Sequence, residues 1–147
     1  MHAATERWAN KSAGAAVDHS AVAARRAYAA GRGIMDGDTI TSLVREHSSQ
    51  PISRVARWIV RREVVQFRCL ADTLFPLFQF DLATMSIRPN AQRVIAELAP
   101  AFDDMELAQW FIRRNACLAG AMPVDLVDSQ LPAVLAAART DRFVICG

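Results

Sequence analysis

The sequence contains few of the residues that build common catalytic and metal sites. Among its 147 residues only three are histidines, His2, His19 and His47, and none has the spacing of a metal-ligand motif. No G-x-S-x-G, H-E-x-x-H or Walker-type stretch occurs, and the glycines of "GRGIMDGD" do not follow the dinucleotide-binding pattern. The sequence therefore predicts no metal, no cofactor and no enzyme active site, and it favours a binding protein.

Cysteines are equally scarce. Cys69, Cys117 and Cys146 are odd in number, widely spaced and form no Cys-x-x-Cys pair, which argues against a disulfide framework and a zinc site. Glu6 and Lys11 lie where a secretory signal would need an apolar run. No stretch approaches the roughly 20 apolar residues of a membrane helix. We therefore expect a cytoplasmic protein without a membrane partner.

Positive and negative charges are nearly equal in number. The chain has 17 Lys and Arg against 15 Asp and Glu, a net charge of +2 that does not by itself predict nucleic-acid binding. Residues 1–70 hold 11 of the basic residues, and Lys11 is the only lysine. Guanidinium groups suit phosphate and carboxylate contacts, but GC-rich coding would give the same arginine bias.

The residues that are present predict a mainly α fold, a compact helical domain with one small antiparallel β-hairpin. With 52% hydrophobic residues the chain has the composition and length of a single folded domain. Residues 1–38 are rich in Ala and Gly, so we expect a poorly ordered extension. Residues 39–63 form a basic amphipathic helical segment, and residues 64–147 form the hairpin and the remaining helices.

The basic segment is centred on "PISRVARWIVRRE", residues 51–63. Its apolar residues follow helical spacing and predict a buried stripe of Ile52, Val55, Ala56 and Ile59. Three arginines lie opposite this stripe and are candidates for nucleic-acid contacts: Arg54, Arg57 and Arg61. Residues 39–47 predict at most a short companion helix, whereas a DNA-reading unit needs a second helix.

Residues 64–82 are rich in β-branched and aromatic side chains and predict the hairpin. Asp72 and Thr73 offer the turn, and Pro76 restricts the second strand to a sheet edge or a strand start. Three aromatic side chains are predicted to face the helices: Phe67, Phe78 and Phe80.

From Pro89 onward the periodicity is helical. A first apolar face consists of Ala91, Val94, Ile95 and Leu98. Asp103 and Glu106 have the spacing of a capping box, flanked by Phe102 and Leu107 as a hydrophobic staple. Capping, rather than catalysis, explains the acidic cluster at this point, and the helix is predicted to run to about Arg114.

A corner follows this helix. Asn115 and Gly120 are predicted to take left-handed backbone conformations, and Pro123 starts a short helix through Leu126. Apolar residues from Leu131 to Ala138 define the last helix, before the tail "RTDRFVICG". Trp110 lies at a core position of its helix, although Trp is also common at interfaces.

The order of "FPLFQFD" (75–81), "LAQWFIRRNACLAGAMPVDLV" (107–127) and "PAVLAAART" (132–140) resembles the toxin-binding domain of the Xre/MbcA/ParS-type antitoxin family. The resemblance covers roughly residues 64–143. In the hairpin region it rests on Pro76, Phe78, Gln79, Phe80 and Asp81. In the helical region it rests on Trp110, Asn115, Leu118, Gly120, Pro123, Asp125 and Leu126.

The resemblance implies an antitoxin that binds a RES-domain toxin, an enzyme that consumes NAD, and occludes its active site. It also implies that the C-terminal part does the blocking, near Arg139, Arg142 and Phe143. Guanidinium groups pair well with anionic groups, although an arginine-rich helix end also complements the helix dipole. Two alternatives remain open: a nucleic-acid-binding regulator that uses the basic helix, and a subunit that forms a homodimer.

Overall fold

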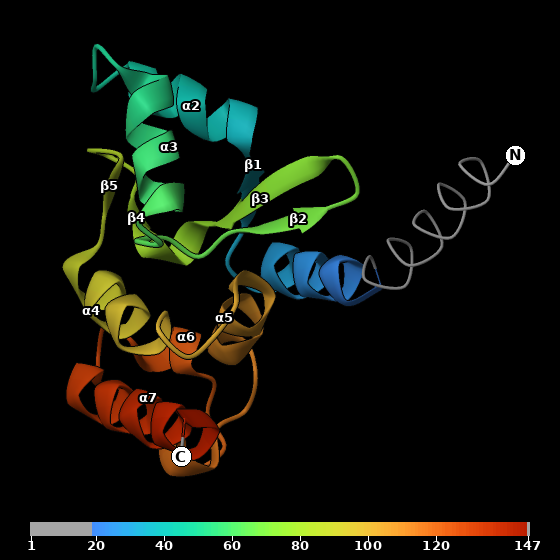
Figure 1. Ribbon diagram of the computed structural model, residues 1–147, viewed down its shortest axis with the longest axis vertical. Helices are drawn as coiled ribbons and strands as arrows, with labels where there is room; N and C mark the ends of the chain where they lie inside the picture. The colour runs from blue at the N-terminus through green and yellow to red at the C-terminus, as the bar shows by residue number, and fades with distance from the viewer. Residues whose placement is uncertain (1–18, 147) are drawn as a thin grey trace, which may run out of the picture.

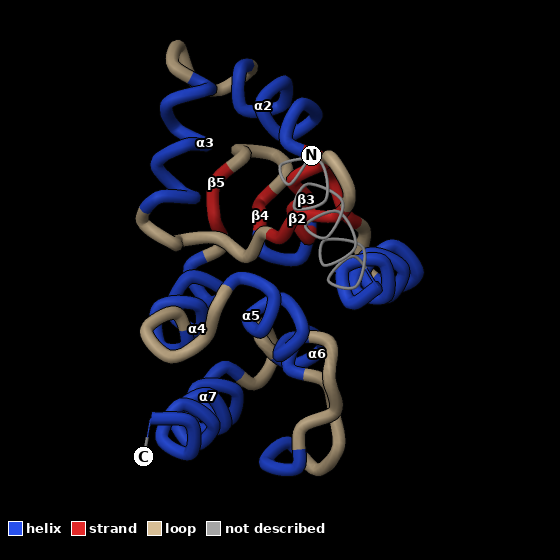
Figure 2. The backbone as a smooth tube through the Cα atoms, turned by 45° about the vertical axis from the view of Figure 1, so that its right-hand side comes forward, coloured by secondary structure: helices blue, strands red, loops and turns tan. Residues whose placement is uncertain are grey.

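The computed structural model describes residues 19–146, and its strands lie between two groups of helices (Figures 1 and 2). On one side are α2 (Gly37–Arg45) and α3 (Pro51–Val60). On the other side are α4 (Pro89–Leu98), α5 (Asp104–Phe111), α6 (Pro123–Leu126) and α7 (Leu131–Cys146). The predicted fold class, mainly α with a small antiparallel β part, is confirmed.

The sheet is larger than the single hairpin that the sequence predicts. The strands β1 (Ile34–Asp36), β2 (Phe67–Cys69) and β3 (Asp72–Pro76) form an antiparallel sheet in the order β1-β3-β2. A 3-10 turn (Leu77–Gln79) then leads into a second ladder of β4 (Phe80–Asp81) and β5 (Ser86–Ile87). The β1 strand comes from the short segment between the N-terminal helix, which ends at residue 31, and α2, and this segment has no strand periodicity of its own.

Two details of the predicted hairpin are wrong. The turn between β2 and β3 is formed by Leu70 and Ala71 rather than by Asp72 and Thr73, and Leu70 takes a left-handed φ of 56°. Pro76 belongs to the central strand, not to an edge, because β1 pairs with β3 on its other side. As the last residue of that strand, Pro76 interrupts no ladder hydrogen bond in the strand interior.

The prediction of poor order over residues 1–38 is wrong for residues 19–38; residues 1–18 lie outside the described part. A helix runs up to residue 31 and buries Ala21, Ala24 and Tyr28 completely or nearly so. These residues share one hydrophobic cluster with the C-terminal helices, so the N-terminal helix is part of that core. Alanines bury little area, but they let the helix approach closely enough for Tyr28 to fill the space beside Phe67.

The α3 helix is present, but its buried face is rotated from the predicted stripe. Val55 and Trp58 are buried, whereas Ile52 and Ala56 are exposed and Ile59 is half-buried. Trp58 lies with its ring centroid 5.6 Å from that of Phe80, in a second hydrophobic cluster that α2 completes. Burial of this large indole sets the rotation of the helix, because it removes more apolar area from water than the smaller stripe residues would.

The segment expected to be a short companion is a regular nine-residue helix, α2. The Asp36 carboxylate accepts a hydrogen bond of 2.8 Å from the Thr39 backbone N–H and caps its first turn. This hydrogen bond lowers the pKa of Asp36. Ile40 and Val44 are fully buried against α3 and the sheet, so tertiary packing stabilises a helix that its sequence alone marks weakly.

The helices α4 and α5 follow the sequence closely. The predicted face of α4 is buried, and it consists of Ala91, Val94, Ile95 and Leu98. Both hydrogen bonds of the α5 capping box are formed. The Glu106 backbone N–H donates to the Asp103 carboxylate at 2.8 Å, and the Asp103 backbone N–H donates to the Glu106 carboxylate at 3.1 Å. The helix ends at Phe111 rather than near Arg114, because Ile112 leaves helical geometry with a φ of −110°.

Candidate functional site

The loop between α5 and α6 is organised by Asn115. The Asn115 carbonyl accepts hydrogen bonds from the backbone N–H groups of Leu118 and Gly120, and its own N–H donates to the carbonyl of Ala121. Its side-chain oxygen also accepts a hydrogen bond of 2.9 Å from the Cys117 N–H. The buried Asn115 therefore fixes the loop from inside, as a structural residue at the centre of the corner.

The predicted backbone conformations of this loop are only half right. Gly120 has the left-handed conformation expected of it, with φ of 85°. Asn115 does not, because it is extended with φ of −119° and caps the 3-10 turn Ala116–Leu118. The second left-handed residue is Ala119, with φ of 55°, so the chain reverses one residue before the glycine.

Asp141 connects this corner to the last helix. Its Oδ2 atom accepts 2.7 Å and 3.0 Å hydrogen bonds from Trp110 Nε1 and Asn115 Nδ2, respectively. The sequence analysis did not identify Asp141. A signal for it exists, since Asp141 lies three residues after the fully buried Ala138. At that spacing on a helix it had to face the core or its margin.

A cavity of about 260 Å³ lies beside this Asp141 junction. The side chains of Glu106, Arg113, Arg114 and Asp141 give its lining both signs of charge, and Trp110 contributes an apolar wall. Arg113 donates a hydrogen bond of 3.0 Å to the Gln109 side chain. Such a lining suits a polar side chain of another protein.

The C-terminal end of α7 carries a different surface. Arg139 and Arg142 each place a nitrogen 3.5 Å from the same Glu97 oxygen, so two guanidinium groups share one carboxylate. Phe143 and Val144 are 78% and 74% exposed. A cavity of about 360 Å³ lies among Glu97, Arg139, Arg142 and Phe143. The surface combines a surplus positive charge with exposed apolar area.

The predicted partner-binding residues thus fall into two groups. Trp110, Asn115, Leu118 and Pro123 are buried and shape the corner, and Leu126 is half-buried in the same core. Gly120 and Phe143 are exposed, and the arginines of the α7 end are partly exposed. The corner residues can position a binding surface, whereas the α7 end can contact a partner directly.

Asp141→Ala is expected to lower the free energy of unfolding by about 1–3 kcal/mol. The substitution leaves the largely buried N–H groups of Trp110 and Asn115 without their acceptor. Urea unfolding followed by tryptophan fluorescence measures the loss. Asp128→Ala is the matched control, since Asp128 is exposed, and its stability should stay within about 0.5 kcal/mol of the parent. Equal stability of the two variants would contradict the role of Asp141.

Comparison with protein-family models, curated proteins and solved structures finds no match for this chain. Within residues 19–146, no helix is long and apolar enough to cross a membrane. In the same part of the chain, no three or more His, Cys, Asp or Glu side chains gather in a group that could hold a metal ion.

Proposed function

We propose that this chain is an antitoxin-like protein that binds a RES-domain toxin and occludes its active site. The observation that carries the proposal is the α7 end, where two exposed apolar side chains adjoin two arginines that share one carboxylate. Apolar anchors surrounded by charge are typical of protein interfaces, and arginine is enriched among their strongly binding residues.

The sequence resemblance supports the same end of the molecule. Trp110 and Leu118 of the helical motif belong to the hydrophobic cluster that also contains the buried face of α7, and Phe78 of the hairpin motif packs against this cluster. Trp110 and Asn115 both donate hydrogen bonds to Asp141 of α7. These two motif residues therefore help to hold in place the helix that carries the exposed arginines. A rigid support lowers the entropy that an interface loses on binding.

The proposal expects a gene for a RES-domain protein among the neighbours of this gene, and the test is co-expression of this chain with that protein. The parent chain is expected to restore growth and to co-purify with the toxin. Phe143→Asp is expected to weaken the complex by at least about 100-fold, because it places a carboxylate in an apolar contact. Isothermal titration calorimetry with the purified toxin measures the change.

Leu82→Asp is the matched control, since Leu82 is also a solvent-exposed apolar residue but lies in the loop after β4. It should bind the toxin like the parent. A toxin that neither associates with the parent chain nor is neutralised by it would refute the proposal. An equal loss of toxin affinity in both variants would mean that the α7 end is not part of the interface.

A second candidate function is DNA binding, and one observation favours it. The helices α2 and α3 are joined by a short turn, residues 46–50, and are followed by the β2–β3 hairpin. This is the order of elements in winged helix-turn-helix DNA-binding domains, in which the second helix enters the major groove. Here that helix is α3, with Arg57 and Arg61 exposed and Arg54 stacked 5.5 Å over the ring of Trp58.

A gel shift with duplex DNA at several salt concentrations tests this candidate. Replacing Arg54, Arg57 and Arg61 by Gln is expected to weaken binding and to reduce the salt slope by about 0.9 for each phosphate that is no longer neutralised. The matched control replaces Arg25, Arg26 and Arg114, which are exposed elsewhere, and changes the net charge equally. An equal effect of the two triple variants would mean that only net charge matters.

A further inference from the structure

The α3 helix carries a line of apolar side chains that its own fold leaves uncovered. Ile52 and Val60 are 70% and 81% exposed, and Ala56 between them is exposed as well. At a spacing of four residues the three lie on one side of the helix, along about 12 Å. We call these three residues the α3 ridge. The buried face of the same helix is formed by Val55 and Trp58.

The ridge leads into a groove between α3 and α4 of about 500 Å³. Val60 lines its α3 side, and Ala96, Ala99 and Pro100 line its α4 side. Arg61, Arg62, Glu63 and Gln92 also line the groove, so its lining carries two positive charges and one negative charge. An apolar side chain that enters this groove would continue the contact made along the ridge.

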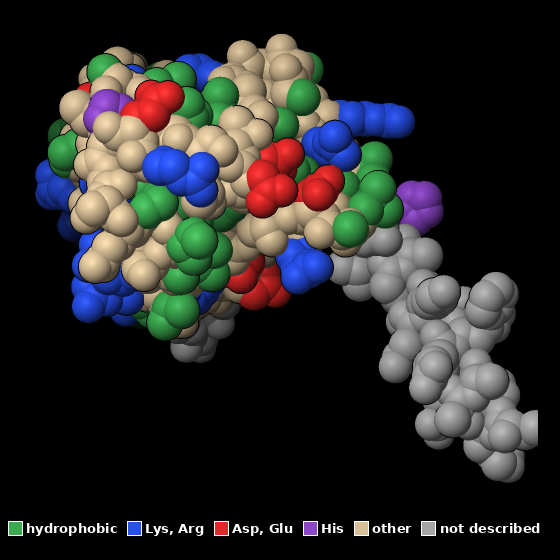
Figure 3. Space-filling model, turned by 90° about the horizontal axis from the view of Figure 1, so that it is seen from above, with side chains coloured by type: hydrophobic (Ala, Val, Ile, Leu, Met, Phe, Trp, Pro, Cys, Tyr) green, Lys and Arg blue, Asp and Glu red, His purple; other side chains and the backbone are tan. Residues whose placement is uncertain are grey.

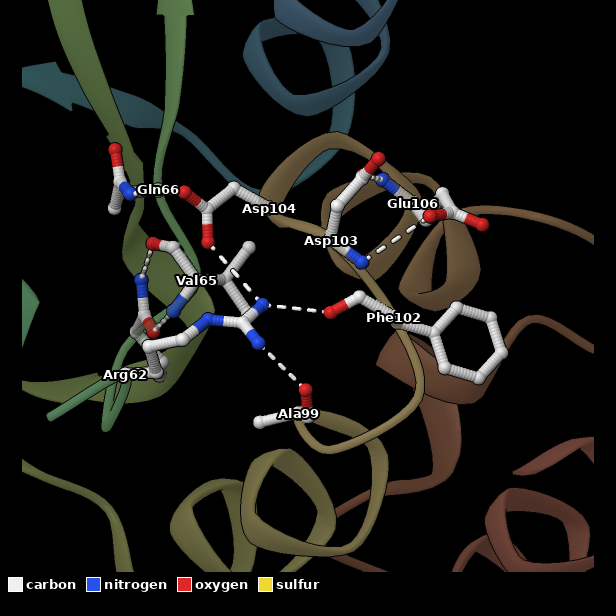
Figure 4. Close-up of polar contacts among 9 residues, drawn as sticks. Arg62, Val65, Gln66, Ala99, Phe102, Asp103, Asp104 and Glu106 are labelled. Carbon is white, nitrogen blue, oxygen red and sulfur yellow. Dashed lines mark hydrogen bonds and ion pairs between the residues drawn. The ribbon is translucent and has the colours of Figure 1, made fainter. Parts of the chain in front are cut away.

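The groove is held open by Arg62. The Arg62 guanidinium donates hydrogen bonds of 2.5 Å and 2.7 Å to the carbonyls of Ala99 and Phe102, and it lies 3.3 Å from the Asp104 carboxylate (Figure 4). These contacts join the end of α3 to the end of α4 and the start of α5. The groove is thus formed before any partner arrives, which reduces the ordering cost of binding.

The surroundings of the ridge are basic. From Pro51 to Arg62 the chain has four arginines and no carboxylate. Glu63 lies 3.9 Å from Arg61, and Arg57 and Arg93 are exposed. The view from above shows hydrophobic side chains beside basic ones at one edge of the molecule, with acidic side chains nearer the middle of the same face (Figure 3). Charge complementarity therefore favours an acidic partner.

We propose that the α3 ridge and its groove dock an acidic amphipathic helix of a partner protein. Apolar residues at helical spacing on the partner would contact Ile52, Ala56 and Val60, and its flanking carboxylates would pair with Arg57 and Arg61. A second copy of this chain fits less well, because two α3 helices packed about a two-fold axis at Ala56 would bring arginines against arginines. Duplex DNA would use the arginines but would leave Ile52 and Val60 without a contact.

This docking site shares no residue with the proposed toxin-binding surface, although Ala96 of the groove and Glu97 of that surface are neighbours on α4. It shares Arg57 and Arg61 with the DNA-binding candidate. The probe is a fluorescein-labelled amphipathic peptide of about 18 residues, with leucines at helical spacing and glutamates on both flanks. The full chain is titrated into it and fluorescence anisotropy is recorded at about 50 mM and 300 mM salt. Saturable binding that weakens with salt is expected.

Val60→Glu is expected to weaken binding of this peptide at least about tenfold. Leu70→Glu is the matched control, since Leu70 is exposed on the β2–β3 turn, and it should bind like the parent. Arg57→Glu combined with Arg61→Glu should weaken binding of the acidic peptide and allow binding of a version with lysines in place of the glutamates. Circular dichroism checks that each variant is folded.

Four results would overturn the proposal. The first is that the parent chain does not bind the acidic peptide, and the second is that it binds the lysine version equally well. The third is a parent dimer in light scattering that Val60→Glu converts to a monomer, which would assign the ridge to a second copy. The fourth is DNA binding that Val60→Glu abolishes, without any binding of the acidic peptide, which would assign the ridge to nucleic acid.

Discussion

Tyr28→Ala is expected to lower the free energy of unfolding by about 3–5 kcal/mol, the range for removing a buried aromatic ring. Tyr28 is completely buried, its ring stacks at 6.3 Å on Phe67 and 6.2 Å on Phe78, and its hydroxyl donates to the carbonyl of Ala108. Because a domain of this size has a stability of about 5–15 kcal/mol, the loss is a large share of it. Urea unfolding followed by circular dichroism measures it.

Tyr28→Phe keeps the ring and removes only the hydroxyl, so it should cost about 1 kcal/mol. Burial raises the pKa of Tyr28 well above its usual value near 10. The tyrosine therefore contributes full stability below about pH 10, and this contribution declines at higher pH as the unfolded chain ionises first. Tyr28→Phe should lack this decline. Equal stability of Tyr28→Ala and the parent would contradict the packing of the N-terminal helix.

Gln79→Leu is expected to destabilise the chain by at least about 3 kcal/mol, from roughly 1–3 kcal/mol for each of the three buried backbone groups left unpaired. The fully buried Gln79 side chain accepts a 2.7 Å hydrogen bond from the Val65 N–H. It also donates to the carbonyls of Val65 and Pro76 at 2.8 Å and 2.9 Å. Leucine has a similar volume, so the effect isolates the missing hydrogen bonds. Thermal unfolding by calorimetry measures it.

Gln130→Leu is the control, because Gln130 is exposed and the same substitution there should change stability by less than about 0.5 kcal/mol. If Gln79→Leu matched this control, the role of Gln79 in joining the loop before β2 to the 3-10 turn would be wrong. Gln79 is also one of the residues on which the sequence resemblance rests, so the motif has a structural reason at this position.

Features encoded in a few neighbouring residues could be predicted from the sequence. The capping box of Asp103 and Glu106 and the buried face of α4 depend on spacing within a single helix, and both were correct. The hairpin was also predicted, but its turn was displaced because Leu70 adopts a left-handed conformation that its residue type does not indicate.

Features that depend on distant contacts could not be predicted. The N-terminal helix looks weak because its buried residues are mostly alanines, and only its packing beside Phe67 and Phe78 makes it part of the core. The rotation of α3 follows from the contact of Trp58 with Phe80, which is 22 residues away in the sequence. At the candidate site, Trp110 and Asn115 were identified, but the carboxylate that joins them was not.

The hydrogen bond between Tyr28 and Ala108 spans 80 residues of sequence, and this separation has a consequence for biosynthesis. The N-terminal helix leaves the ribosome long before α5 is made, so one side of its partner site is missing while translation continues. Long-range closures of this kind slow folding. During this interval Phe67 and Phe78 lack part of their final cover, and the nascent chain is most exposed to aggregation and to chaperones.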